Sequence, residues 1–191
     1  MLRQTLLTLT AAVFSACSTT QKPKPQTAPD APRWTVNREA YDEAKPKDVR
    51  VEISLAKSEA RLLGKDGVTL VEMDCSPGVP EHPTPTGTFR VSEKKAEKRS
   101  NLYGQYVDKT TGEIVIARAW EHKGPPPPNT KWLGIMMPFW MRLTDWGIGM
   151  HVGGFPRGVS TSHGCIRCME EPQRLFFEKV PVGGEVSIRR D

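Results

Sequence analysis

The prediction of fold and chemistry starts from Ser162-His163-Gly164-Cys165-Ile166-Arg167, with a second histidine, His151, upstream of it. A thiol with an imidazole partner can act as a nucleophile at neutral pH, because the imidazole accepts the thiol proton. Gly164 allows a tight turn beside the thiol and leaves backbone N–H groups open to a developing oxyanion. The stretch therefore predicts acyl transfer through a thioester on Cys165. A small buried core residue is the alternative for a lone cysteine.

The residues on either side extend this pattern. His151-Val152-Gly153-Gly154-Phe155-Pro156 followed by the cysteine stretch resembles the active-site signature of the L,D-transpeptidases, the YkuD-like catalytic domain. The intervening loop, residues 152–161, is short for that family. Three further segments resemble the family in the same order, namely a Thr-Pro-x-Gly-x-Phe turn at 84–89, a segment leading into the first histidine at 137–151, and a closing turn and strand at 180–188. The resemblance spans roughly residues 49 to 189.

This resemblance implies an enzyme that acts on peptidoglycan stem peptides. Cys165 would attack the peptide bond that precedes the terminal D-residue of a tetrapeptide stem and expel that residue. The thioester would then pass its acyl group to an amine of a second stem, giving a 3→3 cross-link, or to a lysine of an envelope protein. Water as the acceptor would make the enzyme an L,D-carboxypeptidase. No metal or organic cofactor is implied, and carbapenem-type β-lactams are expected to acylate Cys165.

Matching positions give each residue of the signature an expected role. His151 is the base that deprotonates Cys165 and later protonates the leaving amine. His163 helps to shape the site beside the thiol, with a structural role as the alternative. Ser162 orients the loop by hydrogen bonding, and the N–H groups of Gly164 and Cys165 form an oxyanion hole.

Two further residues, Arg167 and Gly153, are expected to contact substrate. A guanidinium group matches the geometry of a peptide carboxylate, although an ion pair with the glutamates at 170–171 is an equal alternative for Arg167. Val152 stands where some relatives carry a polar residue. We therefore expect a backbone carbonyl to orient the His151 imidazole.

Two rival hypotheses assign the protein to other classes of function. Cys165 and Cys168 form a C-x-x-C, a spacing that occurs in zinc and dithiol redox sites, and with His151 and His163 they would complete a Cys2His2 set. The other rival is a peptidoglycan-binding lipoprotein that keeps the fold without turnover. Cys75 and Cys168 are interpreted either as a disulfide, which an exported protein can form, or as two buried thiols.

The N-terminus predicts export. Residues 1–17 combine a positive start with an apolar stretch that is too short to span a bilayer. Phe14-Ser15-Ala16-Cys17 resembles a bacterial lipobox, which implies lipidation of Cys17 and an anchor in a bacterial membrane, with the protein facing the periplasm or cell wall. An ordinary secretory signal is the alternative.

The segment that follows, residues 18–47, is polar and rich in proline. Such sequence buries too little apolar surface to fold and predicts a flexible tether, with local docking of Trp34 and Tyr41 as the alternative. The catalytic domain would then cover residues 48–191.

Composition supports one mainly β domain. The 191 residues include 17 Pro and 16 Gly, which suits a loop-rich β-sandwich or barrel with one or two short helices better than a helical bundle. The net charge of +5 comes without any nucleic-acid motif, so no nucleic-acid partner is expected. Hydrophobic periodicity predicts strands at 49–55, 60–64, 68–73, 88–92, 113–117, 147–152 and 186–188, a helix over 170–179, and a loop or lid at 124–128.

Overall fold

The structure is a computed structural model that describes residues 33–191. The predicted export signal, the lipidation of Cys17 and the first part of the predicted tether lie outside the described residues. Within the described part, no helix has the length and apolar character needed to cross a membrane.

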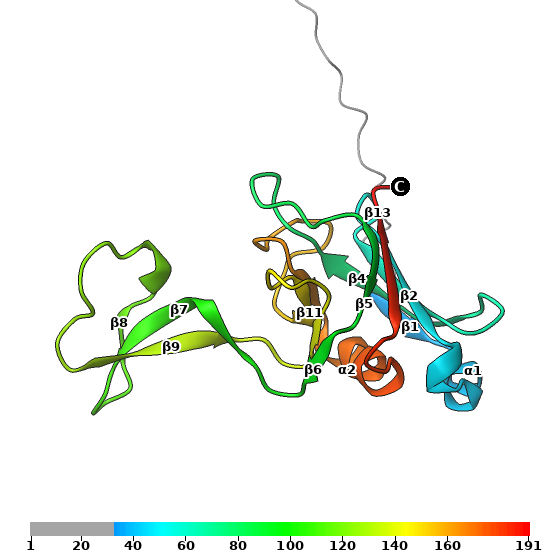
Figure 1. The fold of residues 1–191 in the computed structure, drawn as a ribbon, viewed down its shortest axis with the longest axis horizontal. Coiled ribbons are helices and arrows are strands. Elements are labelled where there is room, and N and C mark those ends of the chain that lie inside the picture. The colour runs from blue at the N-terminus through cyan, green and yellow to red at the C-terminus, as the bar shows by residue number, and fades with distance from the viewer. Residues whose placement is uncertain (1–32) are drawn as a thin grey trace, which may run out of the picture.

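The body of the molecule is a curled sheet, in the order β5-β13-β2-β3-β4-β12-β11-β10-β6, with β1 pairing to β4 (Figure 1). This confirms the mainly β prediction. The strands of the body are β1 (Trp34–Val36), β2 (Arg50–Ser54), β3 (Glu59–Leu63), β4 (Thr69–Ser76), β5 (Gly87–Arg90), β6 (Glu93–Lys95), β10 (Trp140–Arg142), β11 (Gly149–Val152), β12 (Ile166–Cys168) and β13 (Glu185–Arg189).

A second, three-stranded sheet extends from the body, and we call residues 99–136 the arm (Figure 1). Its strands, in the order β8-β7-β9, are β7 (Arg99–Asp108), β8 (Ile114–Ile116) and β9 (Thr130–Met136). A short 3-10 helix, η2 (Ala119–Glu121), packs on β7. Only β8 was predicted as a strand. Few side chains of the ten-residue β7 are buried, so apolar and polar residues do not alternate clearly along it.

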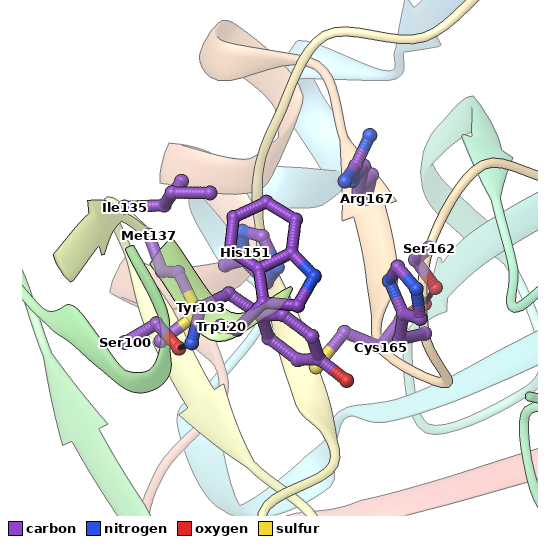
Figure 2. A pocket seen from close by; sticks show the side chains of 10 residues that line it. Ser100, Tyr103, Trp120, Ile135, Met137, His151, Ser162, Cys165 and Arg167 are labelled. Carbon is purple, nitrogen blue, oxygen red and sulfur yellow. Dashed lines mark hydrogen bonds between the residues drawn. The ribbon is translucent and has the colours of Figure 1, made fainter. Parts of the chain in front are cut away.

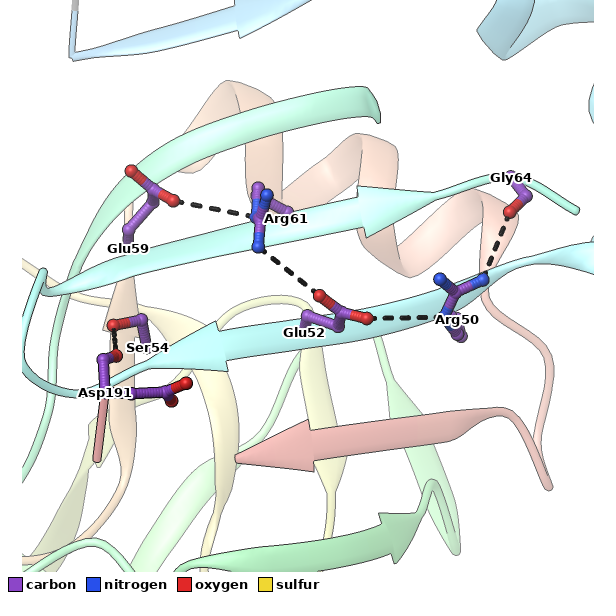
Figure 3. A network of polar contacts seen from close by, with 7 residues as sticks. All are labelled: Arg50, Glu52, Ser54, Glu59, Arg61, Gly64 and Asp191. Atoms are coloured by element: carbon purple, nitrogen blue, oxygen red, sulfur yellow. Dashed lines mark hydrogen bonds and ion pairs between the residues drawn. The ribbon is translucent and has the colours of Figure 1, made fainter. Parts of the chain in front are cut away.

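The alternation in β2 places apolar side chains in the core and charges on the opposite face. Val51 and Ile53 are almost fully buried. Glu52 lies between two guanidinium groups, 3.4 Å from Arg50 and 3.3 Å from Arg61 (Figure 3). These pairs are partly exposed, so each contributes little to stability, on the order of 1 kcal/mol or less.

The predicted helix over residues 170–179 is confirmed as α2 (Glu170–Lys179). It buries Leu175 and Phe176 against the sheet. Its N-terminal half is tied to the body by Gln173, whose side-chain amide donates to the carbonyl of Phe139 at 2.9 Å.

The predicted tether is wrong between residues 34 and 47, which contain β1, α1 (Arg38–Glu43) and the start of the 3-10 helix η1 (Pro46–Asp48). The Tyr41 ring is buried, and its hydroxyl donates to the carbonyl of Leu175 at 3.0 Å. The Lys179 ammonium group donates to the carbonyl of Ala44 at 3.0 Å. Docking of Tyr41 on α2 and packing of Trp34 against the core therefore order a segment whose proline content predicted a linker.

Candidate active site

Two neighbouring parallel strands bring His151 and Cys165 to one pocket (Figure 2). His151 lies in β11, and Cys165 immediately precedes β12, whose Ile166 pairs with Met150. Of the other predicted site residues, Ser162, His163 and Arg167 line the same pocket. The remaining walls come mostly from the arm and the segments that join it to the body, with Ser100, Tyr103, Trp120, Ile135 and Met137.

The His151 imidazole is buried and oriented by backbone. Its Nδ1 lies 2.8 Å from the carbonyl oxygen of Val152. Since a carbonyl only accepts, Nδ1 carries the proton and Nε2 is left as an acceptor. Burial lowers the pKa of His151 to about 4, an effect that the Val152 carbonyl partly offsets. His151 is therefore neutral at pH 7 and has the tautomer of a general base, and the predicted backbone partner is confirmed.

The Cys165 side chain is a neutral thiol at rest. Burial raises its pKa, and the Gly149 N–H and the Arg167 guanidinium group lower it. The thiol donates a weak hydrogen bond to the carbonyl of Gly147, with Sγ 3.8 Å from the oxygen. A neutral thiol can give its proton to a neutral imidazole while the sulfur attacks, so such chemistry needs no ion pair beforehand.

Ser162 holds the loop that carries the thiol, as predicted. Its Oγ accepts from the N–H of Gly164 at 3.1 Å and donates to the carbonyl of Cys165. Because the Gly164 N–H is used in this bond, it does not face the pocket as an oxyanion donor, which corrects that expectation. Gly164 has φ of +109°, and an added Cβ would lie 2.6 Å from Cδ1 of Ile148. The position therefore requires glycine.

The segment that begins at the last residue of β4, residues 76–84, supports the cysteine loop, and we call it the cradle. Ser76 Oγ donates to the carbonyl of Val159 at 2.7 Å and accepts from the N–H of Thr161 at 3.0 Å. The N–H of Val79 donates to the carbonyl of Ser162 at 2.9 Å. Sequence analysis could not predict these contacts, because the cradle and the loop lie far apart in the chain.

His163 joins the arm to the body through its ring. It stacks on Tyr103, with ring centroids 4.8 Å apart, and lies 4.7 Å from the ring of His82. Tyr103 in turn meets Trp120 edge-on at 5.5 Å. Burial and the neighbouring His82 lower the pKa of His163. Sequence analysis missed Tyr103 and Trp120, because nothing near them distinguishes a pocket aromatic from any other.

Arg167 points along the pocket wall. Its Nη1 donates to Thr161 Oγ1 at 3.2 Å and to the carbonyl of Gly154 at 3.4 Å. Among residues 33–191 it forms no ion pair, so the alternative of pairing with the glutamates at 170–171 is wrong. Gly153 lies against it, because an added Cβ there would be 3.1 Å from Cδ of Arg167.

The C-x-x-C is not one site. Cys165 lines the pocket, whereas Cys168 is fully buried in the core, opposite Cys75 in the β12–β4 ladder. Both core residues are thiols, not a disulfide, and burial raises the pKa of Cys168. No cluster of three or more His, Cys, Asp or Glu side chains in the described part could hold a metal ion, which contradicts the Cys2His2 hypothesis.

A second cavity also reaches the thiol. It shares Ser100, Tyr103, Met137, His163 and Cys165 with the first pocket and extends over β10 and the turn that precedes β11. Trp146 on this turn is 72% exposed, whereas Trp140 is buried in the body. Cys165 thus lines both cavities.

Comparison with known proteins agrees with this geometry. Residues 48–188 match the L,D-transpeptidase catalytic domain (YkuD). No curated protein matches the chain. Among solved structures, it is similar to an L,D-transpeptidase from Mycobacterium smegmatis, with 22% identity over 74% of this chain and 58% of that one and a TM-score of 0.53. It also resembles an L,D-transpeptidase from Stackebrandtia nassauensis, with 15% identity over 77% and 58% and a TM-score of 0.54. One from Mycobacterium tuberculosis H37Rv shares 19% identity over 74% and 57%, with a TM-score of 0.53. The chain thus spans less than two thirds of the length of these relatives.

Proposed function

The chain belongs to the L,D-transpeptidase catalytic domain family, and from this membership we propose that it is a peptidoglycan L,D-transpeptidase with Cys165 as its nucleophile. The observation that carries the proposal is the presence, in one pocket, of the Cys165 thiol and a neutral His151 whose Nε2 is left as an acceptor. A binding module has no need of this tautomer.

The first half-reaction forms the acyl-enzyme. Sγ of Cys165 bonds to the carbonyl carbon that precedes the terminal D-residue of a tetrapeptide stem, while His151 Nε2 takes the thiol proton. The carbonyl oxygen becomes an oxyanion, which the Cys165 N–H stabilises. When the intermediate collapses, the C–N bond breaks and His151 gives the proton to the departing amine.

The second half-reaction transfers the acyl group. An acceptor amine attacks the thioester and passes a proton to His151, and the thiolate departs and is reprotonated. The acceptor is an amine of a second stem or of an envelope protein, or water. We place donor and acceptor in the two cavities that meet at Cys165, with Arg167 binding a carboxylate of the peptide.

The exported setting belongs to the same proposal. Lipidation of Cys17 would anchor the protein to a bacterial membrane, with the domain facing the periplasm or cell wall. Carbapenem-type β-lactams are the expected inhibitors. A structure with 20% identity to this chain is described as an L,D-transpeptidase in complex with imipenem, and another as carrying a faropenem-derived adduct.

Intact-mass analysis with imipenem and with a disaccharide-tetrapeptide tests the proposal. The protein without its export signal is compared with Cys165→Ala and His151→Gln. We expect one adduct per wild-type chain, none on Cys165→Ala, and acylation slowed by about 10²-fold or more on His151→Gln. The tetrapeptide should lose its terminal D-residue only with wild type. Binding of the peptide without an adduct or turnover would instead support the peptidoglycan-binding hypothesis.

A further inference from the structure

Thr84 is a buried residue of the cradle that contacts the peptide group next to the thiol. Its side chain is 3% exposed. Its Oγ1 accepts from the N–H of Gly78 at 2.8 Å and donates to the carbonyl of Gly164 at 2.9 Å. One hydroxyl therefore ties the start of the cradle to the residue that precedes Cys165.

This bond fixes the direction of the Cys165 N–H. The peptide group between Gly164 and Cys165 is planar and trans, so its N–H points away from its carbonyl. With the carbonyl held by Thr84, the N–H must point in the opposite direction within the peptide plane, away from Thr84. Ser162 already holds the Gly164 N–H and the Cys165 carbonyl. Neither hydroxyl engages the Cys165 N–H, which is left to meet a substrate oxygen.

The backbone at Gly164 would not hold this orientation by itself. Glycine tolerates many φ and ψ values, so rotation of the following peptide group costs little there. The cradle also lies too close for a side chain to intervene, because a Cβ on Gly78 would be 2.9 Å from both the nitrogen and Cα of Gly164. A hydroxyl that accepts on one side and donates on the other satisfies both backbone groups within this narrow space.

We propose that Thr84 is a positioning residue that aims the Cys165 N–H at the oxyanion formed during acyl transfer. The inference rests on the proposed function for its natural substrate, but it concerns any acyl transfer to Cys165. Thr84 touches neither the thiol nor the acyl group, and it acts through the peptide group of Gly164. Its loss should therefore slow steps that develop an oxyanion and spare steps that do not.

Two reactions of the same thiol separate these cases. p-Nitrophenyl acetate acylates Cys165: the S–C bond forms through an oxyanion, the C–O bond breaks, p-nitrophenolate departs, and His151 takes the thiol proton. Iodoacetamide alkylates Cys165 by direct displacement of iodide, which forms no oxyanion. We expect Thr84→Val to slow acylation by about 10- to 100-fold, since small misplacements of a catalytic group have effects of this order. Alkylation should change by less than about 2-fold across the pH range.

Matched variants complete the experiment. Thr84→Ser keeps the hydroxyl and should restore most of the acylation rate. Thr86→Val makes the same change at an exposed position two residues away and should behave as wild type. If Thr84→Val does not fold, Thr84→Ala removes the hydroxyl with a smaller side chain and carries the same comparison.

The outcomes that overturn the inference are distinct from those that overturn the proposed function. Equal losses in acylation and alkylation would show that Thr84 only supports the loop. An unchanged acylation rate in Thr84→Val would contradict the positioning role. The role would also be contradicted if p-nitrophenyl acetate acylated wild-type Cys165 no faster than a free thiol of equal pKa. A wild-type protein that reacts with p-nitrophenyl acetate but with neither imipenem nor the tetrapeptide would overturn the proposed function and leave the Thr84 comparison intact.

Discussion

Cys165 and His151 illustrate how burial, more than pairing, sets the resting state of the proposed catalytic residues. Burial disfavours the charged form of each group, so it raises the pKa of the thiol and lowers that of the imidazole to about 4. Both shifts oppose a thiolate–imidazolium pair. The pocket therefore holds a neutral thiol at pH 7, and we expect it to act as a nucleophile at that pH when the imidazole takes its proton during attack.

The first prediction concerns the pH dependence of Cys165 alkylation. Because a raised pKa means less thiolate at any given pH, the iodoacetamide rate at pH 7 should be low. The rate should increase with pH, and the midpoint of this increase should lie above the ordinary cysteine pKa of about 8.5. The measurement is the alkylation rate from pH 5 to 10 by mass spectrometry, with Cys165→Ala as the control for background reaction. A plateau reached below pH 7 would indicate a preformed ion pair and contradict this description.

The same residues show how far sequence reasoning reaches at this scale. The signature predicted one site for Cys165, His151 and Ser162, and the structure brings them to one pocket, because the three lie on adjacent strands or on the loop between them. Thr84 and Tyr103 could not be assigned, since each reaches the site through contacts made only when distant segments fold together. Thr84 was visible as part of a turn motif, yet its hydrogen bond to Gly164 was not.

At the scale of elements, helix α1 shows where composition misleads. Its segment was predicted to be a tether because proline and polar residues dominate it. The folded state is decided instead by one aromatic ring, Tyr41, which packs with Lys179 over its face, the ammonium nitrogen 4.4 Å from the ring centroid. The regular elements β2, β3 and α2 were predicted well, since the side chains that each of them buries recur with a clear hydrophobic periodicity in the sequence.

The second prediction follows from this packing. Tyr41→Ala should lower the free energy of unfolding by about 3 kcal/mol, because it leaves a cavity against α2. Tyr41→Phe should lower it by about 1 kcal/mol through the lost hydrogen bond to Leu175. Urea unfolding of the two variants and wild type measures both values. Glu43→Ala, an exposed change on the same helix, should have little effect. Equal free energies of unfolding for Tyr41→Ala and wild type would show that this packing does not stabilise the domain, and would support a tether over residues 34–47.

On the scale of the whole molecule, the site lies where two sheets meet. The body supplies the thiol, the base and the cradle, and the arm supplies the aromatic wall (Figures 1 and 2). Sequence analysis predicted one domain and a strand at 113–117 but not a separate sheet. The arm pairs residues far apart in the chain and buries few side chains, so it leaves little periodic signal. The stacking of Tyr103 on His163 connects it to the body beside Cys165.

The third prediction tests whether the arm covers the thiol. Trp120 lines the pocket and braces Tyr103, so Trp120→Ala should open the pocket while leaving Cys165 and His151 in place. Access of iodoacetamide to the thiol should improve, and the alkylation rate should rise severalfold. The donor peptide should lose an aromatic contact, and its KM should rise by about 10-fold, which corresponds to about 1.4 kcal/mol.

Trp132→Ala provides the matched control for this prediction. Trp132 is also on the arm, but it packs over Gly104 and beside Tyr106, outside the residues that line the pocket. Its loss should loosen the arm without opening the site, so alkylation and KM should stay near wild type. If the two variants change both quantities equally, the effect comes from the stability of the arm. If Trp120→Ala changes neither, the arm is not a cover for Cys165, and the donor peptide must be held by the body alone.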